Sequence, residues 1–555
     1  MTHASFDADW VVIGSGFGGS VSALRLAEKG YSVTVLEQGS ERGDADMPRS
    51  TWDLRRYFYA PRLGLRGIFR ITPFKDVLVV SGAGVGGGSL GYAMTLYVPP
   101  PAFFSDPQWS GLRDWRAELA PHYETAQRML GVTDVTADDP ADGWLREYAD
   151  ERGVTSTYRK ARVGVYLDDP GQTVPDPYFG GEGPARTGCI SCGRCMVGCP
   201  WGAKNSLPKN YLWFARRRGA RIEADRQVVA LRPIDEGRGG WEVVHERTGA
   251  WLRKQRRVTW ARGVVVAGGA LGTNRLLAQA REDGDLPNLS PRLGDLVRTN
   301  SEAVLAVTVP EERAAGLQRR VAITSSIYPD PHTHIETVVY GKEGGAMRAM
   351  FSLMTGDGSR VTRPLKLIGQ ILRHPHRLWQ ISFARGWAAR TVVVLVMQSL
   401  DNAIKLRPRR GLFGLRLQTE QDPDKPNPTF IPVANDFTAW LARRTGGVAS
   451  SSVLESTLSI PTTAHILGGA PIGATPADGV VDADQRVFGY ENLLVCDGAA
   501  VPANVGVNPS LTITAMTERA MAQIPAKPGA PTHRPVGVEP VAQQTATAAP
   551  EPLPA

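Results

Sequence analysis

The stretch from Trp10 to Gln38, WVVIGSGFGGSVSALRLAEKGYSVTVLEQ, decides the fold. It runs from a short apolar segment through Gly14-Ser15-Gly16-Phe17-Gly18-Gly19 and an amphipathic stretch to a second apolar segment. A strand, Gly-x-Gly-x-x-Gly, a helix and a strand within about thirty residues form the dinucleotide-binding fingerprint. Gly14 allows a tight turn, Gly16 lets the backbone approach a pyrophosphate, and Gly19 lets the helix pack close to the sheet. The pattern predicts an α/β fold with a Rossmann-like domain.

An acidic residue, Glu37, ends the second strand of this fingerprint. The helix N-terminus offers free N–H groups and a partial positive charge to phosphates. Glu37 is placed to accept hydrogen bonds from ribose hydroxyls, and an acid there disfavours a 2′-phosphate and therefore NADP. The fingerprint alone does not separate FAD from NAD.

The composition is that of a large globular protein. The 555 residues suffice for two large domains or one interleaved pair, and 42% of them are hydrophobic. Residues 1–9 show neither the basic nor the apolar region of a secretory signal, and no apolar run approaches the length of a membrane span. Five cysteines, four of them within eleven residues, are not a disulfide-scaffold pattern. The expected compartment is the cytoplasm.

A second glycine cluster, Gly84 to Ser89, follows the strand-like residues 77–80. Glycines without side chains permit very close approach of a flat or phosphorylated ligand. The alternative is a flexible loop. Because the glycines directly follow a buried strand, we favour the ligand interpretation.

Four cysteines, Cys189, Cys192, Cys195 and Cys199, stand before Pro200 with the spacing of half a bacterial ferredoxin site. In ferredoxins the fourth cysteine ligates the other cluster, and this chain has no second run. The open alternatives are a 4Fe-4S cluster, a structural zinc site, disulfides and a redox-silent loop.

A basic segment lies between Asp357 and Asp401, where there is no acidic residue. Seven Lys and Arg residues alternate there with Leu, Ile and Trp. This composition predicts an amphipathic surface helix, broken at Pro375, and a peripheral membrane contact through residues 358–400. The alternative, which the sequence favours slightly, is a helical cap whose apolar face is core. No nucleic-acid partner is expected, because the basic run 216–218 is typical of a solvated helix end.

The C-terminal part carries a second set of polar residues beside glycines. His465 precedes a Gly-Gly pair, a strand ends in Asp497, and Asn508-Pro509 opens a helix. A strand, an Asp-Gly pair and a helix N-terminus again form a polar cradle for a ligand. Residues 526–555 are rich in Pro, Ala, Gln and Thr, which predicts a disordered tail.

Together these motifs resemble those of glucose–methanol–choline (GMC) oxidoreductases, and Gly506-Val507-Asn508-Pro509 resembles the steroid-oxidising, cholesterol-oxidase-like branch of actinobacteria. The resemblance covers Asp9 to Arg519. It implies a bound FAD, a Rossmann-like FAD domain from separated segments and a substrate domain on a mixed β-sheet. Gly91, Tyr92 and Ala93 stand where the family often has a polar residue near the flavin. No histidine lies in this loop, so the FAD is expected to be non-covalent.

The resemblance implies a division of the chain into domains. The expected parts are an FAD-binding domain from 1–98, 189–298 (with the cysteine loop) and 462–525, a cap segment at 99–188, a substrate-binding domain at 299–461, and the tail at 526–555.

The resemblance also implies which residues bind the cofactor. The expected contacts with the ADP half come from Gly14, Gly16, Phe17, Gly18, Gly19 and Glu37. Gly87, Gly88 and Ser89 would lie along the pyrophosphate and flavin, Asp497 would face the ribityl chain, and Asn508 and Pro509 would sit at the flavin edge.

Three side chains are candidates for catalysis. His465 suits an acid–base role because imidazole titrates near neutrality, and Asn508 suits a neutral hydrogen-bond donor. Glu336, on the alternating stretch 333–336, matches a family carboxylate that moves a proton from C4 to C6 of a steroid. The alternative for Glu336 is a surface glutamate on a strand.

The resemblance and the residue patterns together imply three alternative functions. The first is an FAD-dependent oxidase of a sterol 3β-hydroxyl that uses O2 and isomerises Δ5 to Δ4. The second is an FAD-dependent dehydrogenase of a sterol or other bulky alcohol that passes electrons to another acceptor through a cluster at Cys189–Cys199. The third is a non-catalytic flavin-binding protein with a redox-sensing cysteine loop.

Overall fold

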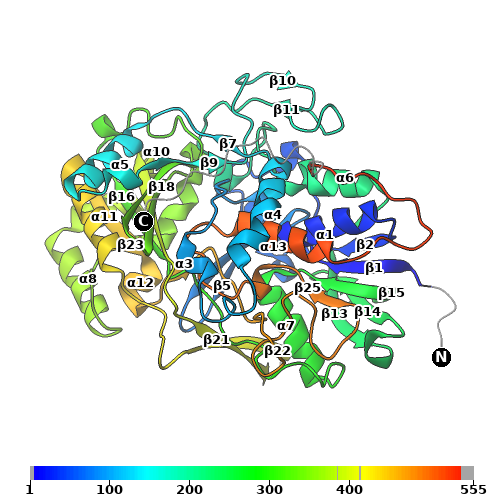
Figure 1. The fold of residues 1–555 in the computed structure, drawn as a ribbon. Helices are drawn as coiled ribbons and strands as arrows, with labels where there is room; N and C mark the ends of the chain where they lie inside the picture. Colours follow the sequence, from blue (N-terminus) through cyan, green and yellow to red (C-terminus); the bar gives the residue numbers. More distant parts are fainter. Residues whose placement is uncertain (1–5, 384, 412–413, 539–555) are drawn as a thin grey trace.

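The computed structural model describes residues 6–383, 385–411 and 414–538. Two seven-stranded sheets lie side by side with helices packed around them (Figure 1). The first sheet has the strand order β12 (Arg221–Glu223), β2 (Val33–Leu36), β1 (Ala8–Ile13), β15 (Arg257–Val266), β14 (Trp241–Arg247) and β13 (Arg226–Pro233), and β25 (Leu493–Val495) also pairs with β15. Three segments far apart in the sequence therefore share one sheet.

The centre of this sheet is parallel, as the fingerprint predicts. β1 pairs with β2 and with β15 in parallel, and helix α1 (Phe17–Glu28) connects β1 to β2. Val11 and Val12 are fully buried, because helices cover both faces of a parallel sheet. The α/β prediction is confirmed.

The edges of this sheet combine an antiparallel meander with a parallel strand. β13, β14 and β15 are antiparallel neighbours, but β12 pairs in parallel with β2 at the sheet edge. Asp225, in the left-handed region with φ 57°, separates β12 from β13. This turn redirects the chain, which alternation of apolar residues does not reveal.

The second sheet carries the candidate site. Its order is β19 (Phe351–Leu353), β23 (Val448–Ser452), β16 (Ala303–Thr308), β20 (Thr391–Gln398), β18 (Thr333–Val338), β17 (Ile323–Asp330) and β8 (Arg159–Lys160). Every pairing within it is antiparallel, so this sheet differs from the mixed sheet that the resemblance implies for the substrate domain. A smaller, three-stranded sheet lies beside it. Its strand order is β24 (Thr462–Thr463), β6 (Leu78–Gly82) and β5 (Phe69–Pro73).

Side-chain alternation gives the second sheet two different faces. Ile335 of β18 packs with residues of α5 (Pro140–Glu151) and α11 (Pro432–Thr445) in one apolar cluster. Val338 of β18 and Val393 of β20 belong to another cluster, which also contains Met94. Glu336 shares the face of Val338, because residues two apart on a strand point the same way.

The first half of the basic segment forms two helices, α8 (Thr362–Arg373) and α9 (Pro375–Ser382), and the second half contains the short helix α10 (Trp387–Arg390) and β20. The predicted break at Pro375 is confirmed. Helix α8 contacts α12 (Val453–Leu458) and β19. No helix within the described ranges is both long and apolar enough to cross a membrane.

The tail differs from its prediction, because residues 527–538 are packed. The Lys527 ammonium donates to Asp9, the His533 and Val536 amides donate to Glu28, and Arg128 donates to the Gly537 carbonyl. Buried acceptors on β1 and α1 and a donor on α4 (Trp115–Met129) thus hold a segment of low hydrophobicity in place, which composition alone does not show. Residues 539–555 lie outside the described part of the chain.

Candidate active site

Three glycines of the first loop permit close backbone packing. A Cβ on Gly14, where φ is +101°, would lie 2.2 Å from the Ala267 carbonyl oxygen. A Cβ on Gly19 would lie 2.0 Å from the Gly14 carbonyl oxygen, and one on Gly18 would lie 1.6 Å from that of Cys496. Gly18 therefore allows α1 to approach the end of β25, a contact that the fingerprint does not predict.

The remaining glycine of the fingerprint, Gly16, borders open space. A Cβ there would meet nothing within 4 Å. No described side chain caps the N-terminus of α1, so its first N–H groups are available to a ligand. This combination of space and free donors fits a pyrophosphate group.

The second glycine cluster lies directly against the first. A Cβ on Gly87 would come within 2.7 Å of the Gly16 Cα, while Gly88 has only the Phe17 ring within 4 Å. The Ser89 hydroxyl donates to the Gly86 carbonyl at 2.7 Å and accepts from the Leu207 amide at 3.1 Å. Ser89 thus holds the short turn η3 (Gly87–Leu90), and its contact with the cofactor stays a prediction.

Glu37 connects the end of β2 to the first glycine loop. Its Oε2 accepts from the amide and hydroxyl of Ser15 at 3.0 and 2.8 Å, and its Oε1 accepts from the Gly39 amide at 2.7 Å. Burial raises the pKa of this carboxyl group, and these hydrogen bonds oppose that rise. The ribose contact stays a prediction, beside this structural role.

Asp497 connects β25 to helix α7 (Gly269–Glu282). Its Oδ2 accepts from the Gly269 amide at 2.8 Å and the Thr273 hydroxyl at 2.5 Å, and its Oδ1 accepts from the Ala499 amide at 2.7 Å. Burial raises the pKa of Asp497 to about 6. The predicted contact with a ribityl chain stays a prediction.

The first catalytic candidate, His465, is paired with a buried carboxylate. Its Nδ1 is hydrogen-bonded to Oε1 of Glu302, whose side chain is fully buried, and Glu302 Oε2 accepts from the Ala464 amide at 2.7 Å. An ionised carboxylate at Nδ1 keeps the proton on that nitrogen. The other nitrogen, Nε2, is then the basic atom of the ring.

The other two candidates contact each other. Nδ2 of Asn508 donates to Oε2 of Glu336 at 3.4 Å, although 172 positions separate the residues. Asn508 Oδ1 and Glu336 Oε1 are buried and find no hydrogen-bond partner among the described residues. Buried polar atoms rarely stay unpaired, so these two atoms mark the place of a ligand.

Burial shifts the pKa of Glu336 well above its ordinary value. Removal from water raises the pKa of Glu336 to about 8, the hydrogen bond from Asn508 lowers it, and the negative charge of Glu302 raises it. The surface-glutamate alternative is wrong, because Glu336 is completely buried. Glu302 thus acts electrostatically on Glu336 while it also holds His465.

One short segment, missed by the sequence interpretation, supports these groups. The Asn300 side chain accepts from the Gly506 amide at 2.7 Å and donates to the Val507 carbonyl at 3.0 Å, just before Asn508. Two residues later the same segment presents Glu302. Its only sequence signal is the polar run 299–302 ahead of β16.

Aromatic residues line the same face near Glu336. His334 stacks on Tyr328 with ring centroids 4.6 Å apart and meets Tyr97 edge-on at 5.2 Å. Both ring nitrogens of His334 lack a described hydrogen-bond partner, and burial lowers its pKa to about 3. A neutral ring cluster beside a protonated carboxyl group suits a bulky apolar substrate with few polar atoms.

The cysteine loop lies elsewhere, around a cavity of about 20 Å³ lined by all four thiols and by Lys204. The thiols are free, and burial raises the pKa of Cys189 to about 11 and that of Cys195 to about 12. The Lys204 ammonium donates to three carbonyls, including that of Cys195 at 3.1 Å. Within the described residues, no group of three or more His, Cys, Asp or Glu side chains is arranged to hold a metal ion.

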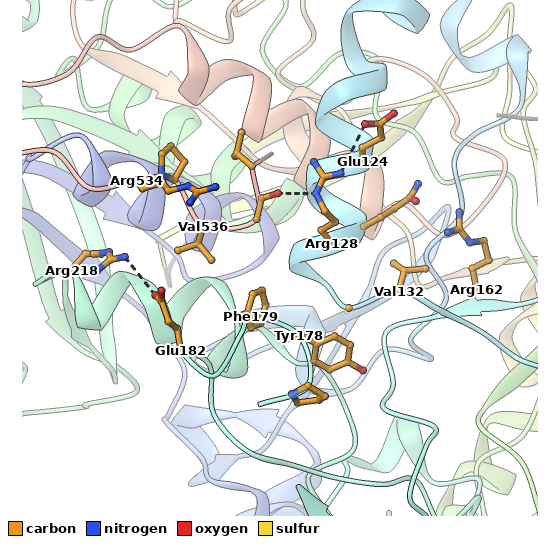
Figure 2. Close-up of a pocket in the computed structure, with 16 residues that line it drawn as sticks. Glu124, Arg128, Val132, Arg162, Tyr178, Phe179, Glu182, Arg218, Arg534 and Val536 are labelled. Atoms are coloured by element: carbon orange, nitrogen blue, oxygen red, sulfur yellow. Dashed lines mark hydrogen bonds and ion pairs between the residues drawn. The ribbon is translucent and has the colours of Figure 1, made fainter. Parts of the chain in front are cut away.

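A larger cleft, of about 740 Å³, is separate from the candidate site. Figure 2 shows Arg128 of α4, Tyr178 and Phe179 of a loop, and Arg534 and Val536 of the packed tail around it. It contains none of the residues predicted to bind cofactor or substrate.

Comparison with known proteins agrees with this architecture. A family profile described as FAD dependent oxidoreductase matches residues 9–317, and one described as GMC oxidoreductase matches residues 415–517. The two glycine loops around the open space at Gly16, together with these matches, define an FAD-dependent oxidoreductase.

Relatives make the assignment more specific. The chain is 49% identical to a cholesterol oxidase of Mycobacterium tuberculosis, over 96% of this chain and 94% of that protein. It is 41% identical to a cholesterol oxidase of Acinetobacter baumannii, over 95% and 96% of the two chains. The fold is also similar to that of pyridoxine 4-oxidase from Mesorbium loti, with a TM-score of 0.61, 16% identity and coverage of 93% and 99%. The chain belongs to the GMC oxidoreductase family.

Proposed function

We propose that this protein oxidises the 3β-hydroxyl of a sterol and isomerises the product from the Δ5 to the Δ4 ketone, with O2 as the final electron acceptor. The observation that carries the proposal is the buried pair of Asn508 and Glu336, with an unpaired oxygen on each, beside an aromatic, apolar sheet face. The named relatives support the same substrate class.

In this proposal, His465 and Glu302 act in the oxidation step. When bound, FAD supplies the acceptor for the hydride of the carbinol carbon. His465 Nε2 takes the hydroxyl proton, and the Glu302 carboxylate stabilises the imidazolium through Nδ1. Asn508 offers its amide N–H groups to the negative charge that develops during the reaction.

Glu336 performs the isomerisation in this proposal. An ionised Glu336 takes a proton from C4, and the C5–C6 electron pair then accepts that proton at C6. Because the same carboxyl group receives and returns the proton, no further reactant is needed. A carboxylate with a raised pKa is a stronger base than an ordinary one, which suits a carbon acid.

The experiment is anaerobic reduction of the purified protein by a panel of alcohols, followed by admission of air. A 3β-hydroxy-5-ene steroid should bleach the yellow colour, and air should restore it. No bleaching by any sterol would refute the substrate class, while bleaching without re-oxidation in air would favour a dehydrogenase.

The dehydrogenase with an iron–sulfur cluster is the second candidate. One observation favours it, since all four thiols and the buried Lys204 surround a single cavity. The raised pKa of Cys189 and Cys195 favours protonated thiols, and the cavity is small for a cluster. We therefore rank the oxidase first, with the cysteine loop as a structural element.

A further inference from the structure

Helix α8 exposes a row of apolar side chains to solvent instead of burying it against the core. Val361, Leu365, Ile368 and Leu372 recur at helical spacing, and their exposed fractions are 70, 64, 53 and 77%. A surface helix of a globular protein normally buries such a stripe. Here the stripe faces away from the protein.

The other face of α8 holds the helix in place. Arg363 is fully buried and donates to the carbonyls of Glu455 at 3.1 Å and Thr429 at 2.9 Å. Gln370 donates to the Met354 carbonyl at 3.0 Å, and Leu367 is buried between them along the helix. Because these contacts fix the rotation of α8, the apolar stripe cannot turn inward without breaking them.

Helix α9 extends the exposed apolar surface. Trp379 and Phe383, four residues apart, have exposed fractions of 59 and 65%, whereas Ile381 is fully buried. Figure 1 shows α8 at the outer edge of the molecule, on the side away from β1, β15 and β25. We call the six exposed residues the apolar stripe; they are Val361, Leu365, Ile368, Leu372, Trp379 and Phe383.

Cationic side chains accompany the stripe. Lys366, Arg373 and Arg377 are exposed, and no carboxylate of the described ranges forms an ion pair with them. Arg360, at the start of the segment, is 3.8 Å from Asp76. Residues 358–400 contain no acid. The surface is therefore apolar and positively charged, which complements a layer of anionic headgroups above hydrocarbon.

We propose that α8 and α9 dock this protein on an anionic lipid bilayer, with the apolar stripe among the acyl chains and the Lys and Arg residues at the headgroups. The core-cap alternative from the sequence holds only in part, because Leu367 and Ile381 pack into the core while the apolar stripe is exposed. The proposal goes beyond the proposed function, since lipid binding by this surface would stand whichever alcohol is oxidised.

The helices that bear this surface pack against the sheet that carries the candidate site. Leu367 of α8 and Ile381 of α9 pack in the same hydrophobic cluster as Val338 and Val393, on the sheet face that also bears Glu336. The docked surface and the candidate site thus share one continuous apolar interior.

The test is sedimentation of the full-length protein with vesicles of phosphatidylglycerol and phosphatidylcholine, and with vesicles of phosphatidylcholine alone. The parent should bind the anionic vesicles more tightly, and added salt should weaken binding. The triple variant Leu365→Gln, Ile368→Gln, Leu372→Gln should lose at least about 100-fold in partitioning. Arg373→Gln with Arg377→Gln should lose about 30-fold on anionic vesicles only.

Matched controls distinguish binding by this surface from nonspecific binding of the protein to vesicles. Leu63→Gln with Leu252→Gln changes two leucines that are 76 and 93% exposed elsewhere, and Arg217→Gln with Arg253→Gln removes two exposed charges elsewhere. Both control pairs should bind vesicles as the parent does. Equal binding by the triple variant would overturn the proposal. The proposal would also be overturned if the parent did not bind vesicles but dimerised through the same residues in sedimentation-velocity runs. The partner of this surface would then be a second copy of the chain.

Discussion

The pH dependence of isomerisation gives the sharpest test of the candidate site, because burial determines the ionisation of Glu336. With a pKa of about 8, only the ionised fraction of Glu336 can take the C4 proton. That fraction is about 1% at pH 6 and about 50% at pH 8, so the rate should rise about 50-fold across this interval and level off above pH 9. The isomerisation rate therefore increases with pH, because the ionised form of Glu336 gains population as the pH rises.

The assay supplies the 5-en-3-one steroid directly and follows the ultraviolet absorbance of the conjugated 4-en-3-one. This substrate bypasses alcohol oxidation, and it has no group that titrates in the interval, so the profile reports the enzyme. Glu336→Gln should lose the pH-dependent rate while still oxidising the 3β-alcohol. Asn508→Ala removes the hydrogen bond that lowers the pKa, and its midpoint should move to higher pH.

Two results would refute the reasoning. A carboxyl group with the ordinary pKa of 4.5 is almost fully ionised at pH 6, so it would give a flat profile between pH 6 and pH 9. A flat profile in the parent would show that the carboxyl group is not raised by burial. Conjugated product formed by Glu336→Gln at the parent rate would remove Glu336 from the step.

Three further predictions concern the cofactor, the acid–base pair and the cysteines. Purified protein should be yellow and release FAD on denaturation, and Glu37→Ala should retain less FAD; equal retention would exclude a role of Glu37 in binding. His465→Ala should keep FAD but slow flavin reduction by about 10²–10⁴-fold in stopped-flow traces. Glu302→Gln should slow the same step and shift its pH profile, whereas a purely structural role would leave that profile in place. Anaerobically purified protein should contain no stoichiometric iron or sulfide if residues 189–199 are structural, and iron with sulfide would revive the dehydrogenase.

The sequence by itself determined the parts of this protein that depend on short windows. Glycine spacing in residues 14–19 and two apolar runs predict a strand, turn and helix, because backbone sterics and side-chain period act over a few residues. Residue type and motif were also enough to select His465, Asn508 and Glu336 as candidates.

Only the tertiary structure decided how these candidates are paired and charged. Glu302 is 163 residues from His465, and no local pattern connects them. The pKa of Glu336 depends on removal from water, which is a property of the packed sheet. Helix periodicity predicted the apolar stripe of α8 but not its direction, because the buried contacts of Arg363 decide which face meets solvent. Burial and long-range contacts arise only when distant segments pack, and therefore a sequence window does not contain them.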